Sequence, residues 1–205
     1  MPGCAFRRRR GPSPGMGAWR WVPKGLDVLL GAWDRVRAER PGDELRLLLV
    51  GTGPDAGKLR TRLAERGRDD VHWVDEFLHD PAEIRRHLSA ADVYAFPSRH
   101  EGFPVAPLEA RAVGLPVVAA DAQGVSDIFE GGEASGGLVV PPDDAVSFAT
   151  ALGRLLDDEV LRRDLGRRAR ARVESAFFLD AVGRELSRFL GLEALGSVRP
   201  APIRE

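Results

Sequence analysis

The residues best suited to chemistry lie at positions 97–110, in the stretch Pro-Ser-Arg-His-Glu-Gly-Phe-Pro-Val-Ala-Pro-Leu-Glu-Ala. This stretch follows a predicted strand, turns at Gly102, and enters a predicted helix whose first turn tolerates Pro104. Backbone N–H groups and the positive end of the helix dipole predict a site there for an anion such as a diphosphate. Glu101 precedes the helix and Glu109 lies about one turn into it, so two carboxylates flank one crevice and could each hold a sugar diol.

A second loop that could approach a ligand is Gly51-Thr52-Gly53-Pro54, which closes a predicted strand and opens a predicted helix. Gly51 and Gly53 form only a fragment of a dinucleotide-binding fingerprint. Lys58 is not followed by the Ser or Thr of a P-loop, which disfavours hydrolysis of a magnesium nucleotide. A tight turn that requires glycine explains the two glycines equally well.

Apolar periodicity predicts a regular alternation of helices and strands around these loops. The predicted strands cover residues 45–50, 71–74, 93–96, 116–119 and 137–140. The predicted helices cover residues 25–39, 56–66, 82–89, 105–113, 145–157, 159–176 and 179–192. Such alternation implies an α/β fold, a Rossmann-like parallel sheet flanked by helices with extra C-terminal helices, and ligands at the carboxyl ends of the strands.

Length and local composition predict one folded domain between two tails. The chain has 205 residues, and one domain commonly spans about 100 to 200 residues, so a second catalytic lobe does not fit. Residues 1–18 are rich in Gly, Pro and Arg without periodicity, which predicts a basic segment that lacks fixed structure. We expect the domain over residues 19–192 and a flexible tail over residues 193–205.

The overall composition excludes several classes of protein. The 30 Lys and Arg residues nearly balance the 31 Asp and Glu residues, which argues against a nucleic-acid binder. Cys4 is the only cysteine, so we expect no disulfide framework, no thiolate metal cluster and a reducing compartment. No apolar run is long enough for a membrane span, and no apolar segment follows Arg7–Arg10 as in a secretory signal. We therefore expect a cytoplasmic protein.

The motifs together resemble the retaining glycosyltransferases of the glycogen-synthase and sucrose-synthase type, also called family four or group one, which have the GT-B fold. The spacing of Glu101 and Glu109 matches the Glu-x7-Glu motif of that family, and Glu-Gly-Phe-Pro is a common form of its opening. Further similar segments are residues 49–54, 95–98, 114–119 and 138–143. The resemblance runs from about residue 20 to residue 190.

This resemblance implies the carboxyl-terminal, donor-binding half of a GT-B enzyme, which holds a nucleotide sugar. In the family, the carboxylate matching Glu109 accepts hydrogen bonds from the ribose hydroxyls, and the one matching Glu101 lies beside the donor sugar. The backbone near the sugar and phosphate corresponds here to Gly102, Phe103, Pro104 and Val105. The loop that contains Gly51 and Gly53 would border the nucleotide pocket.

Residues 19–25, Trp-Arg-Trp-Val-Pro-Lys-Gly, resemble the family segment Gly-Arg-Leu-x-x-x-Lys-Gly. The resemblance implies that Arg20 and Lys24 bind the donor diphosphate. Fixed cations aimed at the departing diphosphate would stabilise the transition state without a metal. The segment here is one residue shorter, Trp19 replaces the glycine, and residues 11–18 replace the apolar strand expected before it.

The first hypothesis is therefore glycosyl transfer with retention of configuration, with Glu101, Lys24 and Arg20 as catalytic residues, in polysaccharide or glycoconjugate biosynthesis. No cofactor and no metal are expected, because the chain has no Asp-x-Asp motif and its histidines lack metal-ligand spacing. The expected partners are a nucleotide sugar and either an amino-terminal acceptor-domain chain or a second copy of this chain. The alternatives are a non-catalytic nucleotide-sugar-binding subunit, a truncated remnant without the acceptor domain, or a sugar-nucleotide epimerase of related fold.

Overall fold

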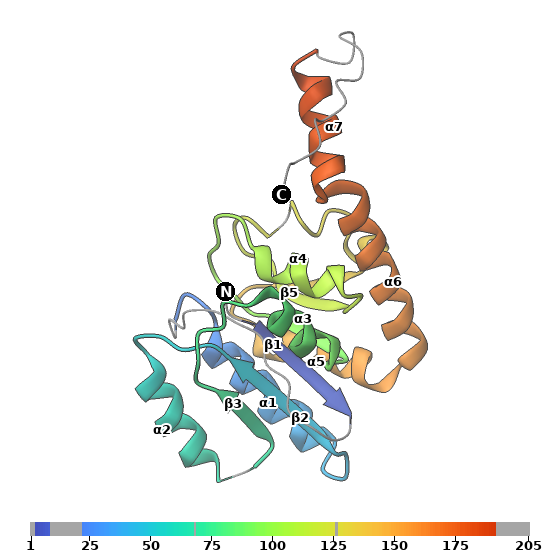
Figure 1. The fold of residues 1–205 in the computed structure, drawn as a ribbon. Helices are drawn as coiled ribbons and strands as arrows, with labels where there is room; N and C mark the ends of the chain where they lie inside the picture. The colour runs from blue at the N-terminus through green and yellow to red at the C-terminus, as the bar shows by residue number, and fades with distance from the viewer. Residues whose placement is uncertain (1–2, 9–21, 68, 126, 192–205) are drawn as a thin grey trace.

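The computed structural model describes residues 3–8, 22–67, 69–125 and 127–191. Within them one six-stranded sheet has the strand order β3-β2-β1-β4-β5-β6, and helices cover both of its faces (Figure 1). The strands are β1 Gly3–Arg8, β2 Leu45–Val50, β3 Val71–Val74, β4 Val93–Phe96, β5 Val117–Ala120 and β6 Gly137–Val140. The helices are α1 Leu26–Glu39, α2 Ala56–Arg66, α3 Pro81–Ser89, α4 Val105–Ala112, α5 Ala145–Asp157, α6 Glu159–Ala176 and α7 Leu179–Phe189, with a 3-10 turn η1 at Gly132–Ser135.

The sheet is buried on both faces, which explains why its central strands read as nearly continuous apolar runs. In β4, Val93 and Ala95 pack in the cluster that contains α1 and α5, whereas Tyr94 and Phe96 pack in the cluster that contains α4. The pairs β2–β3, β4–β5 and β5–β6 are parallel. The α/β fold with a sheet flanked by helices is confirmed.

Strand β1 departs from the prediction that residues 1–18 lack fixed structure. Gly3–Arg8 lies in the middle of the sheet and pairs antiparallel with both neighbours, Cys4 with Leu49 of β2 and with Ala95 of β4. A gap between β2 and β4 would leave two rows of unpaired backbone groups. A strand of six residues is long enough to pair with both neighbours. The prediction is therefore wrong for Gly3–Arg8, while residues 9–18 and 193–205 lie outside the described residues.

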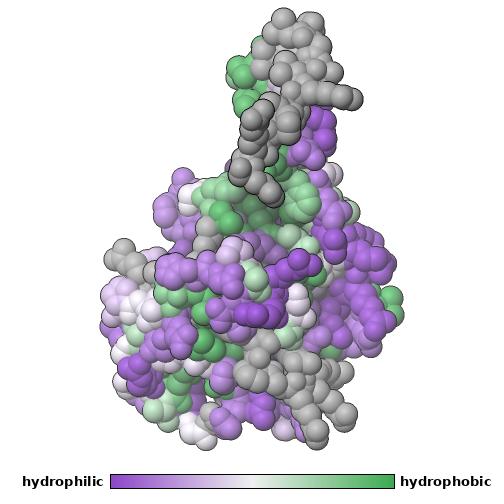
Figure 2. Space-filling view, in the orientation of Figure 1, coloured by the Kyte–Doolittle hydropathy of each residue, from purple (hydrophilic) through white to green (hydrophobic). Residues whose placement is uncertain are grey.

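Helix α7 projects away from the body of the domain beyond the end of α6 (Figure 1). Ala181 is buried, but Leu179 and Phe189 are 90% and 86% exposed. Val182 and Leu186 are also exposed, so an apolar stripe at helical spacing reaches the surface (Figure 2). Among the described residues, no helix combines the length and apolar character needed to cross a bilayer.

Candidate functional site

Lys24 and Glu101 meet at the carboxyl edge of the sheet, although they lie in loops far apart in the chain. The Lys24 Nζ lies 2.6 Å from Glu101 Oε1, and the hydroxyl of Ser98 donates to the same oxygen at 2.6 Å. The Lys24 and Glu101 side chains are 21% and 13% exposed, so the pair lies near the surface but is largely shielded from water. This arrangement places a fixed cation and a carboxylate side by side where ligands of such sheets bind.

The backbone around Lys24 explains why a glycine follows the lysine. Gly25 has φ 64° and packs so closely on the loop after β4 that an added Cβ would lie 2.0 Å from the Pro97 carbonyl oxygen. The Pro23 carbonyl accepts a hydrogen bond from the Arg99 N–H at 3.0 Å, and the Ser98 Oγ lies 3.2 Å from the same carbonyl oxygen. Only glycine allows this approach, which brings Lys24 to Glu101.

The turn between Glu101 and α4 is held from the other side by the loop after β5. The Glu101 N–H donates to the Gln123 carbonyl at 3.2 Å. Gly124 has φ 81°, and an added Cβ would lie 2.6 Å from the Glu101 carbonyl oxygen. Pro104 is the N-cap residue, and the described residues supply no side-chain cap to α4. The start of α4, where the positive end of its dipole lies, follows Glu101 by four residues.

The other residues of the predicted turn have unequal surroundings. Gly102 has open space where a Cβ would be added, and the Val105 side chain is exposed at the start of α4. The ring of Phe103 is exposed and lies 6.4 Å from that of Phe177, centroid to centroid. An accessible backbone and an exposed ring are compatible with the predicted contact to a donor sugar, which stays a prediction.

Glu109 lies on α4, eight residues after Glu101 in the chain. It lines a cavity of about 410 Å³ between α3 and α4, whose walls include Ile84 and Arg170. Burial raises the pKa of the Glu109 carboxyl, because a carboxylate loses hydration there. The structure brings Lys24 and Glu101 into contact, whereas the place of Glu109 in one crevice with Glu101 stays a prediction.

Gly51 closes strand β2 with φ 125°, a conformation that favours glycine. Its N–H donates to the Val74 carbonyl at 3.0 Å, and its own carbonyl accepts from the Trp73 indole N–H at 2.9 Å. The tight turn is therefore a sufficient reason for Gly51, and the nucleotide contact of Gly51 and Gly53 stays a prediction. Arg20 lies outside the described residues.

The sequence did not single out Ser98 and Arg99 as residues that contact the site. Ser98 is 1% exposed, and its hydroxyl contacts the Glu101 carboxylate. The available signal was a serine and an arginine two and three residues after a fully buried strand, at the strand ends where ligands bind. The described residues contain no group of three or more His, Cys, Asp or Glu side chains that could hold a metal ion.

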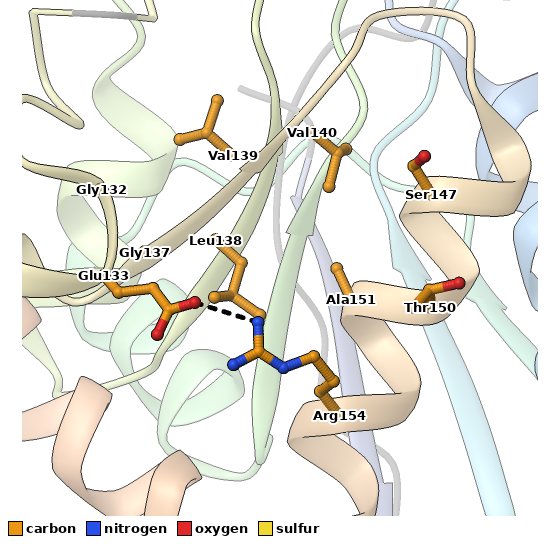
Figure 3. A pocket seen from close by; sticks show the side chains of 10 residues that line it. All are labelled: Gly132, Glu133, Gly137, Leu138, Val139, Val140, Ser147, Thr150, Ala151 and Arg154. Carbon is orange, nitrogen blue, oxygen red and sulfur yellow. Dashed lines mark hydrogen bonds and ion pairs between the residues drawn. The ribbon is translucent and has the colours of Figure 1, made fainter.

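Another cavity, of about 440 Å³, lies at one end of the strand order, between edge strand β6 and α5 (Figure 3). Arg154 and Glu133 form an ion pair of 3.0 Å across it. The hydroxyls of Ser147 and Thr150 donate to Asp144 and to the Val146 carbonyl. Because these polar groups already have protein partners, the cavity offers little to a polar ligand, and we place the site at Lys24 and Glu101.

Three proteins are similar to this chain, one in sequence and two in solved structure. A mannosyltransferase of Corynebacterium glutamicum, described as GDP-mannose-dependent and acting on a monoacylated phosphatidylinositol monomannoside, is 34% identical over 85% of this chain. Sucrose-phosphate synthase from Thermosynechococcus elongatus superposes with TM-score 0.70 and 28% identity, over 90% of this chain and 46% of that one. The C-terminal domain of the group 1 protein LpcC from Francisella tularensis has TM-score 0.70 and 22% identity, over 82% of this chain and 87% of that one.

The chain spans 46% of the length of the corynebacterial protein, 42% of a putative colanic acid biosynthesis glycosyltransferase of Salmonella typhimurium and 16% of an exopolysaccharide phosphotransferase of Streptomyces coelicolor. The family model described as "Glycosyl transferases group 1" matches residues 16–158, which include Lys24, Glu101 and Glu109. The fold, the Lys24–Glu101 site and this match agree, and the chain belongs to the group 1 glycosyl transferase family.

Proposed function

We propose that this chain is the donor-binding half of a retaining glycosyltransferase that uses a nucleotide-diphosphate sugar. The observation that carries the proposal is the contact between Lys24 and Glu101 at the carboxyl edge of the sheet. A relative that is described as GDP-mannose-dependent supports a nucleotide-sugar donor. The half-length match supports a role as one half of the enzyme.

In this proposal Lys24, together with Arg20, neutralises the diphosphate. Negative charge grows on the diphosphate as the glycosyl bond breaks, and a positioned ammonium stabilises that charge more in the transition state than in the ground state. Lys24 would then exchange part of its contact with Glu101 for a contact with phosphate. The Glu101 carboxylate would accept hydrogen bonds from hydroxyls of the donor sugar and so orient it.

The remaining roles follow the same geometry. The backbone of residues 102–105 would contact the sugar and phosphate beside the start of α4, where the helix dipole favours an anion. Glu109 would accept hydrogen bonds from the ribose, and Gly51 and Gly53 would border the nucleotide. We propose that no metal takes part, since two cations and a helix start supply the charge that a divalent ion would otherwise supply.

The acceptor-binding half is proposed to be a separate amino-terminal unit, with a second copy of this chain as the alternative. The exposed apolar stripe of α7 supports such a partner, because an unpartnered stripe of this kind is costly in water. Addition of the partner should then shield Leu186 and Phe189 from solvent and restore transfer to an acceptor.

The direct test is a calorimetric titration of the purified chain with UDP, GDP and ADP. We expect one nucleotide to bind, and we expect Lys24→Ala and Glu109→Ala each to weaken that binding while the chain stays folded. Because each charge-assisted hydrogen bond contributes about 1.5–3 kcal/mol, each substitution should cost at least about tenfold in Kd. A folded chain that binds none of the three nucleotides would refute the proposal.

A non-catalytic nucleotide-sugar-binding subunit is the second candidate function. The shortened segment 19–25 favours it, since that segment departs from the family pattern where the diphosphate cations are expected. Transfer assays separate the two candidates. Turnover of a nucleotide sugar by this chain with an acceptor-domain partner would support the enzyme, whereas nucleotide binding without turnover under any partner would support the subunit.

A further inference from the structure

Arg99 joins three separate segments at the carboxyl edge of the sheet. Its Nη1 and Nη2 donate to the two carboxylate oxygens of Asp27 at 2.8 and 2.7 Å. Its Nη1 also donates to the Val22 carbonyl at 2.5 Å, and its Nε donates to the Asp143 carboxylate. Four of the five guanidinium N–H groups therefore have protein partners. Arg99 consequently has no two adjacent N–H groups left to bind a phosphate through two hydrogen bonds.

The two carboxylates bound to Arg99 differ in setting. Burial acts to raise the pKa of Asp27, but the hydrogen bonds and positive charge of Arg99 outweigh it and leave that pKa below its ordinary value. Asp143 has φ 60°, the one described residue other than glycine with a positive φ. The Arg99 side chain is 22% exposed and those of Asp27 and Asp143 are 41% and 62% exposed, so the bidentate pair with Asp27 is the better shielded of the two.

These contacts bracket Lys24 in the chain. Val22 precedes Lys24 by two residues and Asp27 follows it by three, and Arg99 holds both. Residues 22–25 form a turn that pairs with no strand, so no sheet hydrogen bonds fix the lysine. Two further sets of contacts join residues 22–25 to residues 98–101. They are the contacts of the Pro23 carbonyl with Ser98 and Arg99, and the ion pair between Lys24 and Glu101.

We propose that Arg99 is a positioning residue that holds residues 22–27 so that the Lys24 ammonium stays beside Glu101, aimed at the diphosphate of a bound nucleotide. Arg99 acts through Lys24 and does not itself touch the ligand. The identity of the ligand rests on the proposed function, whereas the effect on residues 22–27 does not.

A double-mutant cycle tests this inference with a nucleoside diphosphate and its nucleoside as probes. We expect Arg99→Gln to weaken binding of the diphosphate about tenfold and to leave the nucleoside within about twofold, because only the phosphates meet Lys24. In a Lys24→Ala background, Arg99→Gln should have no further effect. An equal loss in both backgrounds, or an equal loss for the nucleoside, would overturn the inference.

Amide hydrogen exchange gives a second readout that needs no nucleotide. Arg99→Gln should speed exchange of the Gly25 amide, which donates to the Val22 carbonyl at 3.1 Å, at least about tenfold. The Tyr94 amide, which donates to Pro116 inside the sheet, should keep its protection. Arg154→Gln is the matched control, because it removes another ion-paired arginine far from the turn. Unchanged exchange at Gly25 would overturn the inference, even if the wild-type chain bound no nucleotide and the proposed function failed.

Discussion

Two arginines, one at the carboxyl ends of the strands and one in the interior, have their positive charge neutralised in different ways. At the carboxyl edge, Arg99 meets two carboxylates from distant segments. In the interior, Arg111 of α4 is 0% exposed and donates to the carbonyls of Ile128 at 2.6 Å and of Ser135, with its guanidinium 4.8 Å from the centre of the Phe129 ring.

The two arginines differ in the groups that neutralise their positive charge. Burial lowers the pKa of Arg111 to about 10, because its charge is met by carbonyl dipoles and a ring instead of a carboxylate. Arg111 therefore fixes the loop after β5 permanently. The ion pairs of Lys24 and Arg99 at the carboxyl ends of the strands join opposite charges. A charged ligand can replace one partner of such a pair, as we propose for the contact of Lys24 with Glu101. Arg111 in the interior supports the fold, whereas we propose that the charges at the carboxyl ends of the strands serve ligand binding.

The largest effect should come from the interior. Arg111→Ala leaves two buried carbonyls without their donor and opens a cavity, so we expect a loss of about 3–5 kcal/mol in the free energy of unfolding. Urea denaturation measures this. Arg154→Ala, which removes a half-exposed arginine, is the control and should stay within about 0.5 kcal/mol of wild type. Equal urea midpoints for the two variants would show that Arg111 contributes no more to the stability of the fold than Arg154.

A backbone change at the edge should affect both stability and binding. Gly25→Ala forces a Cβ against the Pro97 carbonyl at φ 64°, so we expect a loss of about 1–3 kcal/mol in stability and at least about tenfold in nucleoside diphosphate affinity. Gly42→Ala is the matched control, because Gly42 has open space and no positive φ. Calorimetric titration and thermal unfolding measure the two effects, and a Gly25→Ala chain that binds like wild type would contradict this account.

The charged pair itself should contribute little to stability. Glu101→Gln keeps the shape of the side chain and removes the ion pair with Lys24, so we expect a change of about 1 kcal/mol or less in the free energy of unfolding. Transfer by the assembled enzyme should nevertheless fall at least about a hundredfold, since the donor sugar loses its orienting carboxylate. A large loss of stability would instead make Glu101 a structural residue like Arg111.

Glu109 provides a pH-dependent test of burial, because desolvation is the largest influence on its pKa. Its pKa in the folded chain is raised above the ordinary value of 4.5, so its stabilising contribution is present below that value and is lost as the pH rises through the folded pKa. Glu109→Gln removes this dependence. The urea midpoint of the variant relative to wild type should therefore be higher at pH 7 than at pH 4. The reverse order would show that Glu109 has a cationic partner.

The smallest effect is expected from metal removal. If Lys24 and the start of α4 supply the charge at the edge, EDTA should leave the Kd for a nucleoside diphosphate unchanged. Titration in EDTA and in excess Mg²⁺ measures this. A requirement for the metal would show that the cations at the edge are insufficient for binding.

The sequence predicted most of the fold, because five of the six strands are apolar runs with a helix pattern between them. It failed at β1, since Gly3–Arg8 has no periodicity and is a strand only because β2 and β4 both need a partner. In the site, the structure brings Lys24 and Glu101 into contact, whereas their roles toward a ligand stay predictions. The Arg99 network could not be predicted, because Asp27 and Asp143 meet Arg99 only after the sheet has formed. Glu109 was expected to share one crevice with Glu101, and the direction that its side chain takes depends on how α3 packs against α4.

Strand β1 also has a consequence for synthesis on the ribosome. Cys4 pairs with Ala95, so this segment emerges long before both of its partners exist and has to wait, unpaired, until β4 has been made. The strands on either side cannot join into one sheet before then. We therefore expect the sheet to close late, with β1 inserted between two parts that have already formed, and the amino-terminal segment to be most vulnerable to proteases and to chaperone capture during that interval.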